Sequence, residues 1–268
     1  MPRPFIPRHE LLKAFLLGHG IAYSASPAMQ NAAFQALGLD WTYELLDVSP
    51  AELPAAAKRL RDVGIGGANV TIPHKQAVME HLDSVDADAL RARAVNTIAK
   101  EGTRLVGSNT DVDGIRAALT EVGLEPRGAN VLILGAGGSA RAAAVALDGA
   151  HLTFVARRPD EVDVPGRVVA WSDTSWTRQA RSADLLLNAT PLGRRDEMPL
   201  RPNALPRAGA VIDLVYVRGG TPLVRKARSV GLRTADGWGI LLAQGARSFE
   251  IWTGRAAPLD AMRQTLPQ

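Results

Sequence analysis

Residues 131–142 read VLILGAGGSARA and place an apolar run directly before three closely spaced small residues. Gly135, Gly137 and Ala140 fit the pattern G-x-G-x-x-[GA], and an alanine-rich helical stretch continues to Leu147. The first glycine permits a tight turn, the second lets the backbone approach a pyrophosphate, and the third small residue lets strand and helix pack closely. The helix N-terminus then offers free N–H groups to the phosphates. The segment therefore favours a dinucleotide-binding strand, loop and helix over an ordinary glycine-rich turn.

The end of the next apolar run indicates which dinucleotide binds. In NAD-binding proteins an acidic residue about 20 residues after the glycine loop holds the ribose 2′-hydroxyl. Here the run ends in Arg157 and Arg158, whose guanidinium groups suit a 2′-phosphate. Asp160 and Glu161 follow closely and slightly weaken this preference. We therefore expect NADP, with at least one of the two arginines on its phosphate; the alternative is that one or both arginines lie in water.

Short apolar runs bounded by turn residues continue through the second half of the chain, as in strands that are covered on both faces. They are residues 151–158, 168–172, 184–190 and 210–216. The first half alternates strand-like and helix-like stretches. We expect strands at 13–18, 41–48 and 66–72, and helices at 26–37, at 51–63 and from about Pro73. Ser26 is expected to cap the first helix, with Pro27 at its first position.

This alternation predicts an α/β fold with largely parallel sheets. The pattern changes near residues 111–127, which divides the chain into two units. We expect an N-terminal α/β substrate domain at residues 1–112 and a C-terminal Rossmann-like dinucleotide-binding domain at 113–239. A helical stretch near 240–254 is expected to fold back, so that residues 240–268 join the first unit.

The composition excludes several kinds of chemistry. The 268 residues are 46% hydrophobic, which is enough to build cores. Cysteine is absent, so disulfides, thiolate metal sites and a cysteine nucleophile are excluded. The formal charge of +4 comes from scattered basic residues, which argues against nucleic-acid binding. No apolar run is long enough to span a membrane, and the histidines show no metal-ligand spacing, so we expect no membrane and no metal.

The N-terminus places basic residues before a short apolar stretch, as secretory signals do. His9, Glu10 and Lys13 interrupt that stretch, and no small-residue cleavage site follows it. We therefore expect a cytoplasmic protein.

Polar motifs gather in the first unit beyond what its packing needs. They are residues 23–27, 69–75, 94–98 and 107–111. Taken singly, Ser26, Thr71 and Asp111 could cap helices, Lys75 could lie in water and Asn96 could satisfy a turn. Taken together, they offer hydroxyl and amide donors for a polyhydroxylated substrate, with one ammonium and one carboxylate for proton transfer.

These motifs resemble those of the shikimate dehydrogenase family, and the resemblance runs from about Gly18 to Gly254. The family's serine, lysine and Asn-Thr-Asp motifs are matched at residues 23–27, 69–75 and 109–111. Three later pieces follow in family order, at residues 188–193, 213–216 and 244–254. Six motifs in order are far more specific than the glycine loop alone.

The resemblance implies the NADPH-dependent, reversible reduction of 3-dehydroshikimate to shikimate, a step toward the aromatic amino acids. Lys75 and Asp111 would be the catalytic pair, with Lys75 either as proton donor or as an electrostatic and positioning group. The implied substrate-binding residues are Ser24, Ser26, Thr71, Lys75, Asn96, Asp111, Tyr216 and Gln244. The implied cofactor-binding residues are Gly135, Ala136, Gly137, Gly138, Ser139, Ala140, Arg157, Arg158, Thr190, Leu214 and Gly237.

Several positions depart from the family pattern. Tyr23 and Gln30 replace common histidines, and Arg194 replaces a frequent methionine. Tyr23 and Gln30 flank the serine motif, so substrate affinity or preference is expected to differ. Arg194 is expected to face water; the alternative is that it adds charge near the nicotinamide.

Two other functions compete with this interpretation. One is a paralogue with the same chemistry that acts on quinate or an amino analogue. The other is a non-catalytic regulator that binds NADP or shikimate, against which the presence of Lys75 and Asp111 argues, because a binding module needs no proton donor. In each case the expected partner is a small molecule, and the protein is expected to be a monomer or a homodimer.

Overall fold

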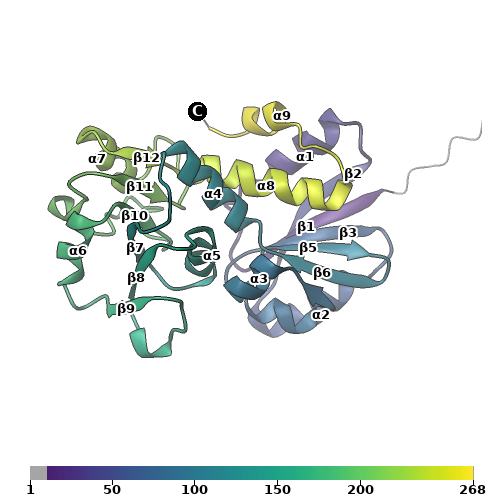
Figure 1. Cartoon of the computed structure of the whole chain (residues 1–268). Helices are drawn as coiled ribbons and strands as arrows, with labels where there is room; N and C mark the ends of the chain where they lie inside the picture. The colour runs from purple at the N-terminus through teal and green to yellow at the C-terminus, as the bar shows by residue number, and fades with distance from the viewer. Residues whose placement is uncertain (1–10, 268) are drawn as a thin grey trace, which may run out of the picture.

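The computed structural model describes residues 11–267, and in them the chain forms two six-stranded sheets. Figure 1 shows the sheets side by side, with helices α4 (Asp111–Glu121) and α8 (Gly237–Thr253) crossing the junction between them. The α/β prediction with a Rossmann-like second half is confirmed. The domain limits at residues 112 and 240 stay a prediction. Residues 1–10, on which the argument about a secretory signal partly rests, lie outside the described part of the chain.

The first sheet has the strand order β2-β1-β3-β5-β6-β4. Its strands are β1 (Leu12–Gly18), β2 (Trp41–Asp47), β3 (Ile65–Val70), β4 (Ser84–Val85), β5 (Thr97–Glu101) and β6 (Arg104–Ser108). β1 is parallel to β2 and β3, whereas β5 is antiparallel to both β3 and β6. The sheet is therefore mixed, and its β5–β6 hairpin differs from the expectation of parallel strands. The hairpin turns at Gly102, whose φ of +64° lies in the region that favours glycine.

Three expectations about the helices of the first unit are wrong. These helices are α1 (Ser26–Ala36), α2 (Leu53–Arg59), α3 (Ala87–Ala92) and α9 (Leu259–Gln264). Ser26 does not cap α1, because it is the first helical residue and no side chain caps the helix. The Ser26 N–H instead donates to the hydroxyl of Ser24 at 3.2 Å. The helix expected over 51–63 is split into a 3-10 turn at Pro50–Glu52 and the shorter α2.

The helix expected from Pro73 is also absent. Residues 72–76 form turns, and only a 3-10 helix follows at Ala77–His81. The N–H of His74 donates to the Thr71 carbonyl at 2.9 Å, and the Lys75 carbonyl accepts the Val95 N–H at 2.8 Å. Because a neighbouring segment binds the Lys75 carbonyl, that group is not part of a helical ladder. The turn thus holds Lys75 just beyond the carboxyl end of β3.

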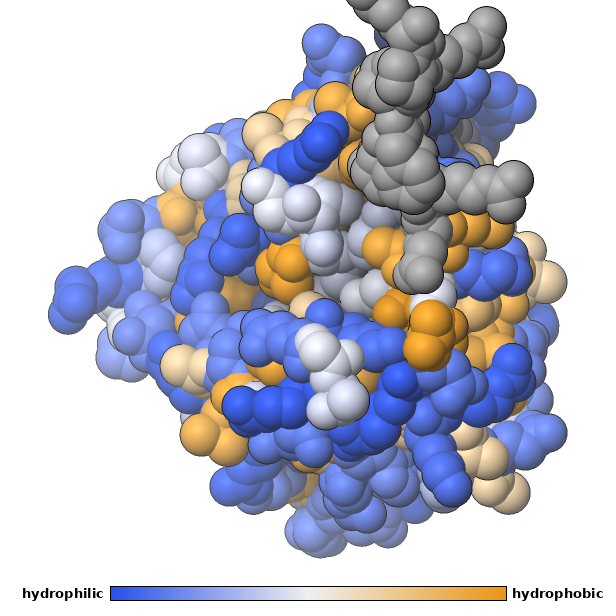
Figure 2. Space-filling view, turned by 90° about the vertical axis from the view of Figure 1, so that its right-hand side faces the viewer, coloured by the Kyte–Doolittle hydropathy of each residue, from blue (hydrophilic) through white to orange (hydrophobic). Residues whose placement is uncertain are grey.

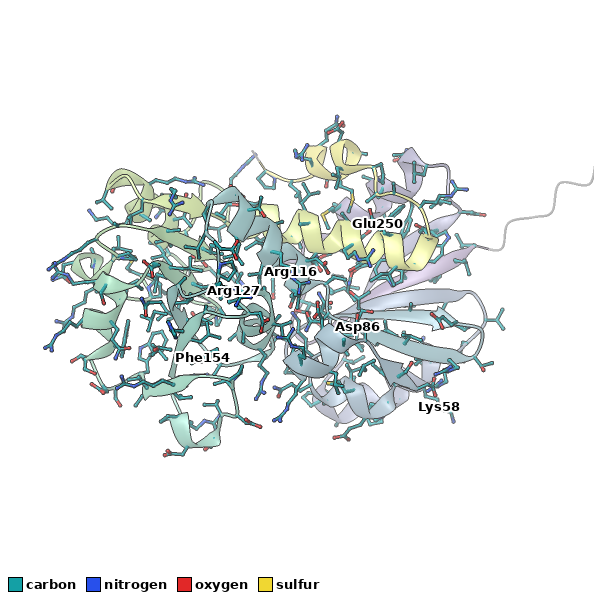
Figure 3. The ribbon with its side chains drawn as sticks, viewed as in Figure 1. Lys58, Asp86, Arg116, Arg127, Phe154 and Glu250 are labelled. Atoms are coloured by element: carbon teal, nitrogen blue, oxygen red, sulfur yellow. The ribbon has the colours of Figure 1, made fainter. Side chains whose placement is uncertain are left out.

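The second sheet has the order β12-β11-β10-β7-β8-β9, and all its pairings are parallel. Its strands are β7 (Asn130–Leu134), β8 (His151–Ala156), β9 (Arg167–Ala170), β10 (Leu185–Asn188), β11 (Ala210–Asp213) and β12 (Arg233–Ala235). Helices α5 (Gly138–Ala146), α6 (Trp176–Ser182) and α7 (Pro222–Ser229) flank it. Each predicted apolar run contains one strand, and Phe154, labelled in Figure 3, is fully buried in the core.

Helix α8 follows the second sheet in sequence but packs against the first unit. The rings of Phe249 on α8 and Phe34 on α1 have centroids 5.4 Å apart. The indole N–H of Trp252 donates to the carbonyl of Ile98 in β5 at 3.0 Å. The helix therefore brings Gln244 to the same junction as the loops of both sheets. Within residues 11–267, no helix has the length and apolar character that a membrane crossing requires.

Figure 2 shows the end face of the first unit, which hydrophilic side chains largely cover. Apolar side chains lie there in separate small groups. Such groups are ordinary, because apolar atoms supply more than half of the surface of a typical folded protein.

The approach of α8 to β3 depends on Gly67. A Cβ at this position would lie 2.5 Å from the Ile98 carbonyl oxygen and 2.5 Å from the Trp252 indole nitrogen. Gly67→Ala should therefore lower the free energy of unfolding by about 1–3 kcal/mol through overpacking. Urea denaturation checks this against Gly239→Ala, an α8 position whose added Cβ meets nothing closer than 3.5 Å. A wild-type midpoint for Gly67→Ala would contradict the packing argument.

Candidate active site

The glycine loop between β7 and α5 has the conformation that its sequence predicts. Gly135 has a φ of +103°, and a Cβ there would crowd the Ala189 carbonyl oxygen at 3.2 Å. A Cβ at Gly137 would meet nothing within 4 Å, so the space in front of that residue is open to a ligand. Helix α5 begins at Gly138 and presents its first N–H groups to this space.

A cavity of about 710 Å³ runs along this loop, and we call it the dinucleotide cavity. Of the predicted cofactor residues, those that line it are Gly135, Ala136, Gly137, Gly138, Ser139, Arg157, Arg158 and Thr190. Ala140 is fully buried behind the loop, whereas Leu214 and Gly237 line the neighbouring cavity. Arg158 pairs with Glu161 at 2.7 Å, whereas Arg157 has no ion pair within residues 11–267.

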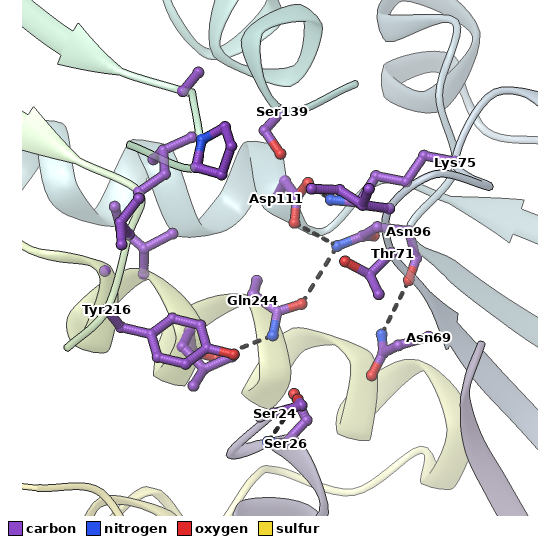
Figure 4. Close-up of a pocket in the computed structure, with 18 of the residues that line it drawn as sticks. Ser24, Ser26, Asn69, Thr71, Lys75, Asn96, Asp111, Ser139, Tyr216 and Gln244 are labelled. Carbon is purple, nitrogen blue, oxygen red and sulfur yellow. Dashed lines mark hydrogen bonds and ion pairs between the residues drawn. The ribbon is translucent and has the colours of Figure 1, made fainter. Parts of the chain in front are cut away.

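The neighbouring cavity, of about 170 Å³, is called the cleft below. All eight predicted substrate residues line it: Ser24, Ser26, Thr71, Lys75, Asn96, Asp111, Tyr216 and Gln244. Figure 4 shows Lys75, Asp111 and Ser139 toward one end, and Ser24 and Ser26 toward the other. Lys75, Ser139 and Thr190 line both cavities, so the cleft and the dinucleotide cavity meet at Lys75.

Lys75 and Asp111 form an ion pair at this meeting point. The Lys75 ammonium donates to Oδ2 of Asp111, and the two side chains are only 12% and 15% exposed. The Asn96 amide donates to Oδ1 of Asp111 at 2.8 Å, so both carboxylate oxygens are held. Asp111 is the first residue of α4, where the helix dipole favours a negative charge. The pair is thus fixed and poorly screened by solvent.

Five buried side chains, Asn69, Asn96, Thr97, Thr110 and Ser248, form a hydrogen-bond network beneath the cleft, here called the buried network. The Asn69 amide donates to Ser248 Oγ at 2.9 Å and to Thr97 Oγ1 at 3.0 Å. The Thr110 N–H donates to Asn96 Oδ1 at 2.7 Å, and Thr110 Oγ1 lies 3.0 Å from Ser248 Oγ. The network therefore connects α8 to β5 and to the start of α4.

Sequence reasoning missed four members of the buried network as site residues: Asn69, Thr97, Thr110 and Ser248. Asn69, Thr97 and Thr110 stand inside recognised motifs, but nothing in the sequence distinguished them from their neighbours. Ser248 could have been found from its spacing, because it follows Gln244 by four residues and so lies on the same face of α8.

A buried carboxylate, Asp213, organises the loop after β10 that lines both cavities. Asp213 Oδ1 accepts the Asn188 amide at 2.9 Å, and its Oδ2 accepts the Thr221 hydroxyl at 2.6 Å. Asn188 in turn donates to the Leu192 carbonyl at 2.9 Å and accepts the Thr190 hydroxyl at 2.7 Å. Burial raises the pKa of Asp213 to about 6, although these hydrogen bonds oppose the shift.

Arg194 lies further along the same loop and reaches across the mouth of the cleft. It is exposed, as expected, but its guanidinium carbon lies 3.8 Å from the centroid of the Tyr23 ring. This distance is typical of a cation–π contact. Arg194 and Tyr23 both line the cleft, so a residue pair that departs from the family pattern closes one side of it.

Metal ligands are not gathered anywhere in the described residues. No group of three or more His, Cys, Asp or Glu side chains that could hold a metal ion occurs within residues 11–267. The two carboxylates that line the cavities are paired with cations: Asp111 with Lys75, and Glu161 with Arg158.

The sequence and the fold both resemble those of known proteins. The model of the shikimate dehydrogenase substrate binding domain matches residues 16–98. The model of the shikimate 5′-dehydrogenase C-terminal domain matches residues 237–266. The shikimate dehydrogenase (NADP(+)) of Methanopyrus kandleri is 41% identical, over 94% of this chain and 93% of the relative.

The chain belongs to the shikimate dehydrogenase family.

Solved structures show the same relationship. Shikimate 5-dehydrogenase of Thermus thermophilus, solved with NADP(H) and shikimate, is 37% identical with a TM-score of 0.85, covering 95% of this chain and 98% of that one. The ligand-free 5-ketofructose reductase of a Gluconobacter species is 34% identical with a TM-score of 0.80, covering 95% and 97%. The fold of the shikimate dehydrogenase family thus also occurs in a protein named for a different substrate.

Tyr23 and Gln30, which stand where this family commonly has histidine, lie in different places. Tyr23 is 45% exposed at the mouth of the cleft. Gln30 is fully buried in α1, and its amide donates to the Gly245 carbonyl of α8 at 2.9 Å. Gln30 thus joins two helices and does not line the cleft, whereas Tyr23 is placed to affect the substrate.

The raised pKa of Asp213 predicts a specific pH dependence of stability. Between its unfolded pKa near 4 and its folded pKa of about 6, the unfolded chain releases the proton first, so ionisation of this group destabilises the fold as the pH rises. Asp213→Asn removes this effect. The free energy of unfolding of the variant, relative to wild type, should rise by about 1.4 kcal/mol per pH unit across this window and then level off.

Urea unfolding of both proteins from pH 4 to pH 7 measures that difference. Asp260→Asn, at a carboxylate that is 93% exposed on α9, is the matched control for loss of a carboxylate. A pH-independent difference between Asp213→Asn and wild type would mean that Asp213 has the same pKa in the folded and unfolded states.

Proposed function

We propose that this chain catalyses the NADPH-dependent, reversible reduction of 3-dehydroshikimate to shikimate. The observation that carries the proposal is the position of Lys75 and its partner Asp111 where the dinucleotide cavity meets the cleft. A dehydrogenase must bring its nicotinamide and its substrate together beside a group that handles a proton. The names of the relatives, shikimate dehydrogenase (NADP(+)), supply the substrate and the cofactor.

NADP fits the residues that line the dinucleotide cavity. The open space at Gly137 and the first turn of α5 suit a pyrophosphate, with Ala140 packing behind the loop. Arg157 and Arg158 would hold the 2′-phosphate, since a guanidinium binds phosphate oxygens through paired hydrogen bonds. Thr190, Leu214 and Gly237 would lie on the nicotinamide side, next to the cleft. When bound, NADPH supplies the hydride.

Lys75 and Asp111 handle the proton. During reduction, negative charge develops on the substrate's ketone oxygen, and the Lys75 ammonium stabilises that charge and donates a proton to it. Oδ2 of Asp111 accepts a hydrogen bond from the ammonium, and Oδ1 accepts one from the Asn96 amide. In the reverse direction Lys75 takes the proton from the substrate hydroxyl. Because the pair is preformed, little reorganisation accompanies the step.

The remaining cleft residues bind the substrate's other groups. Ser24, Ser26, Thr71, Asn96, Tyr216 and Gln244 provide hydroxyl and amide groups for its carboxylate and ring hydroxyls. Burial raises the pKa of Tyr216, a shift that the Ser24 hydroxyl opposes, so its phenol remains a hydrogen-bond donor at neutral pH. The buried network holds Asn96 and the helix that carries Gln244 in place.

The proposal includes the wider organisation of the protein. Residues 1–112 with 240–268 would form the substrate domain and residues 113–239 the NADP domain. The enzyme would work in the cytoplasm as a monomer or homodimer, without a nucleic-acid partner.

The direct test is reduction of NADP⁺ by the purified protein when shikimate is added. Quinate, an amino analogue and 5-ketofructose complete the substrate panel, because the nearest alternatives differ only in substrate. Preference for quinate or the amino analogue would identify the paralogue. Binding of NADP without turnover of any of these compounds at any pH would contradict an enzymatic function.

Lys75→Ala should lower kcat by about 10²-fold or more, which is the usual cost of losing an acid–base group. NADPH affinity should stay nearly unchanged, because the phosphates are held elsewhere. Steady-state kinetics and NADPH fluorescence titration measure the two quantities. Lys58→Ala is the control, because Lys58 (labelled in Figure 3) is exposed on α2 and lines neither cavity. Wild-type kcat in Lys75→Ala would remove Lys75 from the chemistry.

Arg157→Ala should raise the KM for NADPH more than the KM for NADH, because only NADPH carries the 2′-phosphate. Loss of a charge-assisted hydrogen bond at an exposed site predicts about a ten-fold effect on NADPH. Arg178→Ala, an exposed arginine of α6 outside both cavities, should change neither constant. Equal effects of Arg157→Ala on both cofactors would show that Arg157 does not contact the phosphate.

A further inference from the structure

The cleft contains one charge that the proposed mechanism does not use. Its charged lining residues are Lys75, Asp111 and Arg194. Lys75 and Asp111 neutralise each other, whereas Arg194 has no ion pair or side-chain hydrogen bond within residues 11–267. The cleft therefore carries a net positive charge that comes from Arg194.

This charge lies near the end of the cleft away from Lys75. Tyr23, whose ring stacks under the Arg194 guanidinium, directly precedes Ser24. Ser24 and Ser26 lie at the opposite end of the cleft from Lys75 (Figure 4). Arg194 and Tyr216 both line the cleft. The positive charge of Arg194 also lowers the pKa of Tyr216, against the larger effect of burial. Within residues 11–267, no charged side chain other than Lys75, Asp111 and Arg194 lines the cleft.

The protein holds Arg194 in this position from both sides. On its own loop, Gly193 has a φ of +108° and donates its N–H to the Glu197 carboxylate at 3.1 Å. The backbone N–H of Arg194 donates to the Pro191 carbonyl oxygen at 3.4 Å, which closes a turn. Asn188 and Asp213 anchor the start of the loop, and Tyr23 supports the guanidinium from the first unit. A side chain held in this way loses little conformational freedom when it binds a ligand.

We infer that Arg194, supported by Tyr23, selects substrates that carry a carboxylate, by placing a positive charge at the end of the cleft formed by Ser24, Ser26 and Tyr216. The inference rests on the proposed function and specifies it further. Hydroxyl groups can bind a carboxylate or a neutral polar group, whereas a guanidinium adds a positive charge that favours the anion further. Arg194 is thus a specificity-determining residue that acts on the substituent far from the reacting oxygen.

The test compares shikimate with its uncharged methyl ester at saturating NADP⁺. Arg194→Met should raise the KM for shikimate about ten-fold, the effect of losing one charge-assisted hydrogen bond, and should change kcat much less. The kcat/KM for the ester should stay within about two-fold, because the ester offers no charge to Arg194. Arg194→Lys should restore part of the shikimate affinity, since it keeps the charge but not the planar stack.

Two further variants separate charge recognition from a structural role. Tyr23→Leu should raise the KM for shikimate about two- to five-fold, the scale of a lost cation–π contact. Arg195→Met is the control, since Arg195 is exposed next to Arg194 but lines neither cavity. Raising the salt concentration from about 20 to 300 mM should increase the KM for shikimate more steeply in wild type than in Arg194→Met. This measurement needs shikimate alone and no ester.

The inference would be overturned if Arg194→Met lost kcat/KM equally for shikimate and for its methyl ester. It would also be overturned if the variant kept the wild-type KM for shikimate and the wild-type salt dependence. Failure of the proposed function would look different, because wild type itself would then turn over no shikimate, and the inference would fall with it. A loss of kcat/KM for shikimate but not for its ester, partly restored in Arg194→Lys, supports the role of Arg194.

Discussion

The buried network beneath the cleft is the constraint on which the arrangement of the site depends. Five polar side chains are removed from water there, and each unsatisfied donor or acceptor would cost about 1–3 kcal/mol. Their partners come from β3, β5, the start of α4 and α8, so these elements must meet in one register for the network to be satisfied. The same register brings Asn96 to Asp111, Asp111 to Lys75, and Gln244 to the cleft. Stability and the geometry of the proposed chemistry thus rest on the same hydrogen bonds.

The parts of the fold that repeat a simple pattern could be predicted from the sequence. The second sheet is parallel and covered on both faces, so its strands are apolar runs between turn residues, and each run contains a strand. The glycine loop was also predictable, because the backbone at Gly135 requires a φ that other residues disfavour. The eight substrate residues were assigned by motif resemblance, and all of them line the cleft. Their roles stay predictions.

Features that depend on long-range contacts could not be predicted. The β5–β6 hairpin was missed because its residues carry polar motifs rather than a clean alternation. The helix expected from Pro73 is absent because the carbonyl of Lys75 bonds to Val95, a partner 20 positions along the chain. Ser248 pairs with Asn69 across 179 positions, and the contact of Arg194 with Tyr23 joins the two units. In the sequence, Tyr23 and Arg194 are two separate departures from the family pattern, whereas in the structure they form one pair.

In the proposed mechanism, substrate and cofactor meet at Lys75 and Asp111. A crystal structure of the protein with NADP⁺ and shikimate would show this meeting point. We expect the hydroxyl to be oxidised to lie within about 3 Å of the Lys75 nitrogen, with its carbon facing the nicotinamide and the carboxylate toward Ser24 and Ser26. A shikimate bound with its carboxylate at Lys75, or with no hydroxyl within hydrogen-bond distance of Lys75 or Asp111, would contradict it.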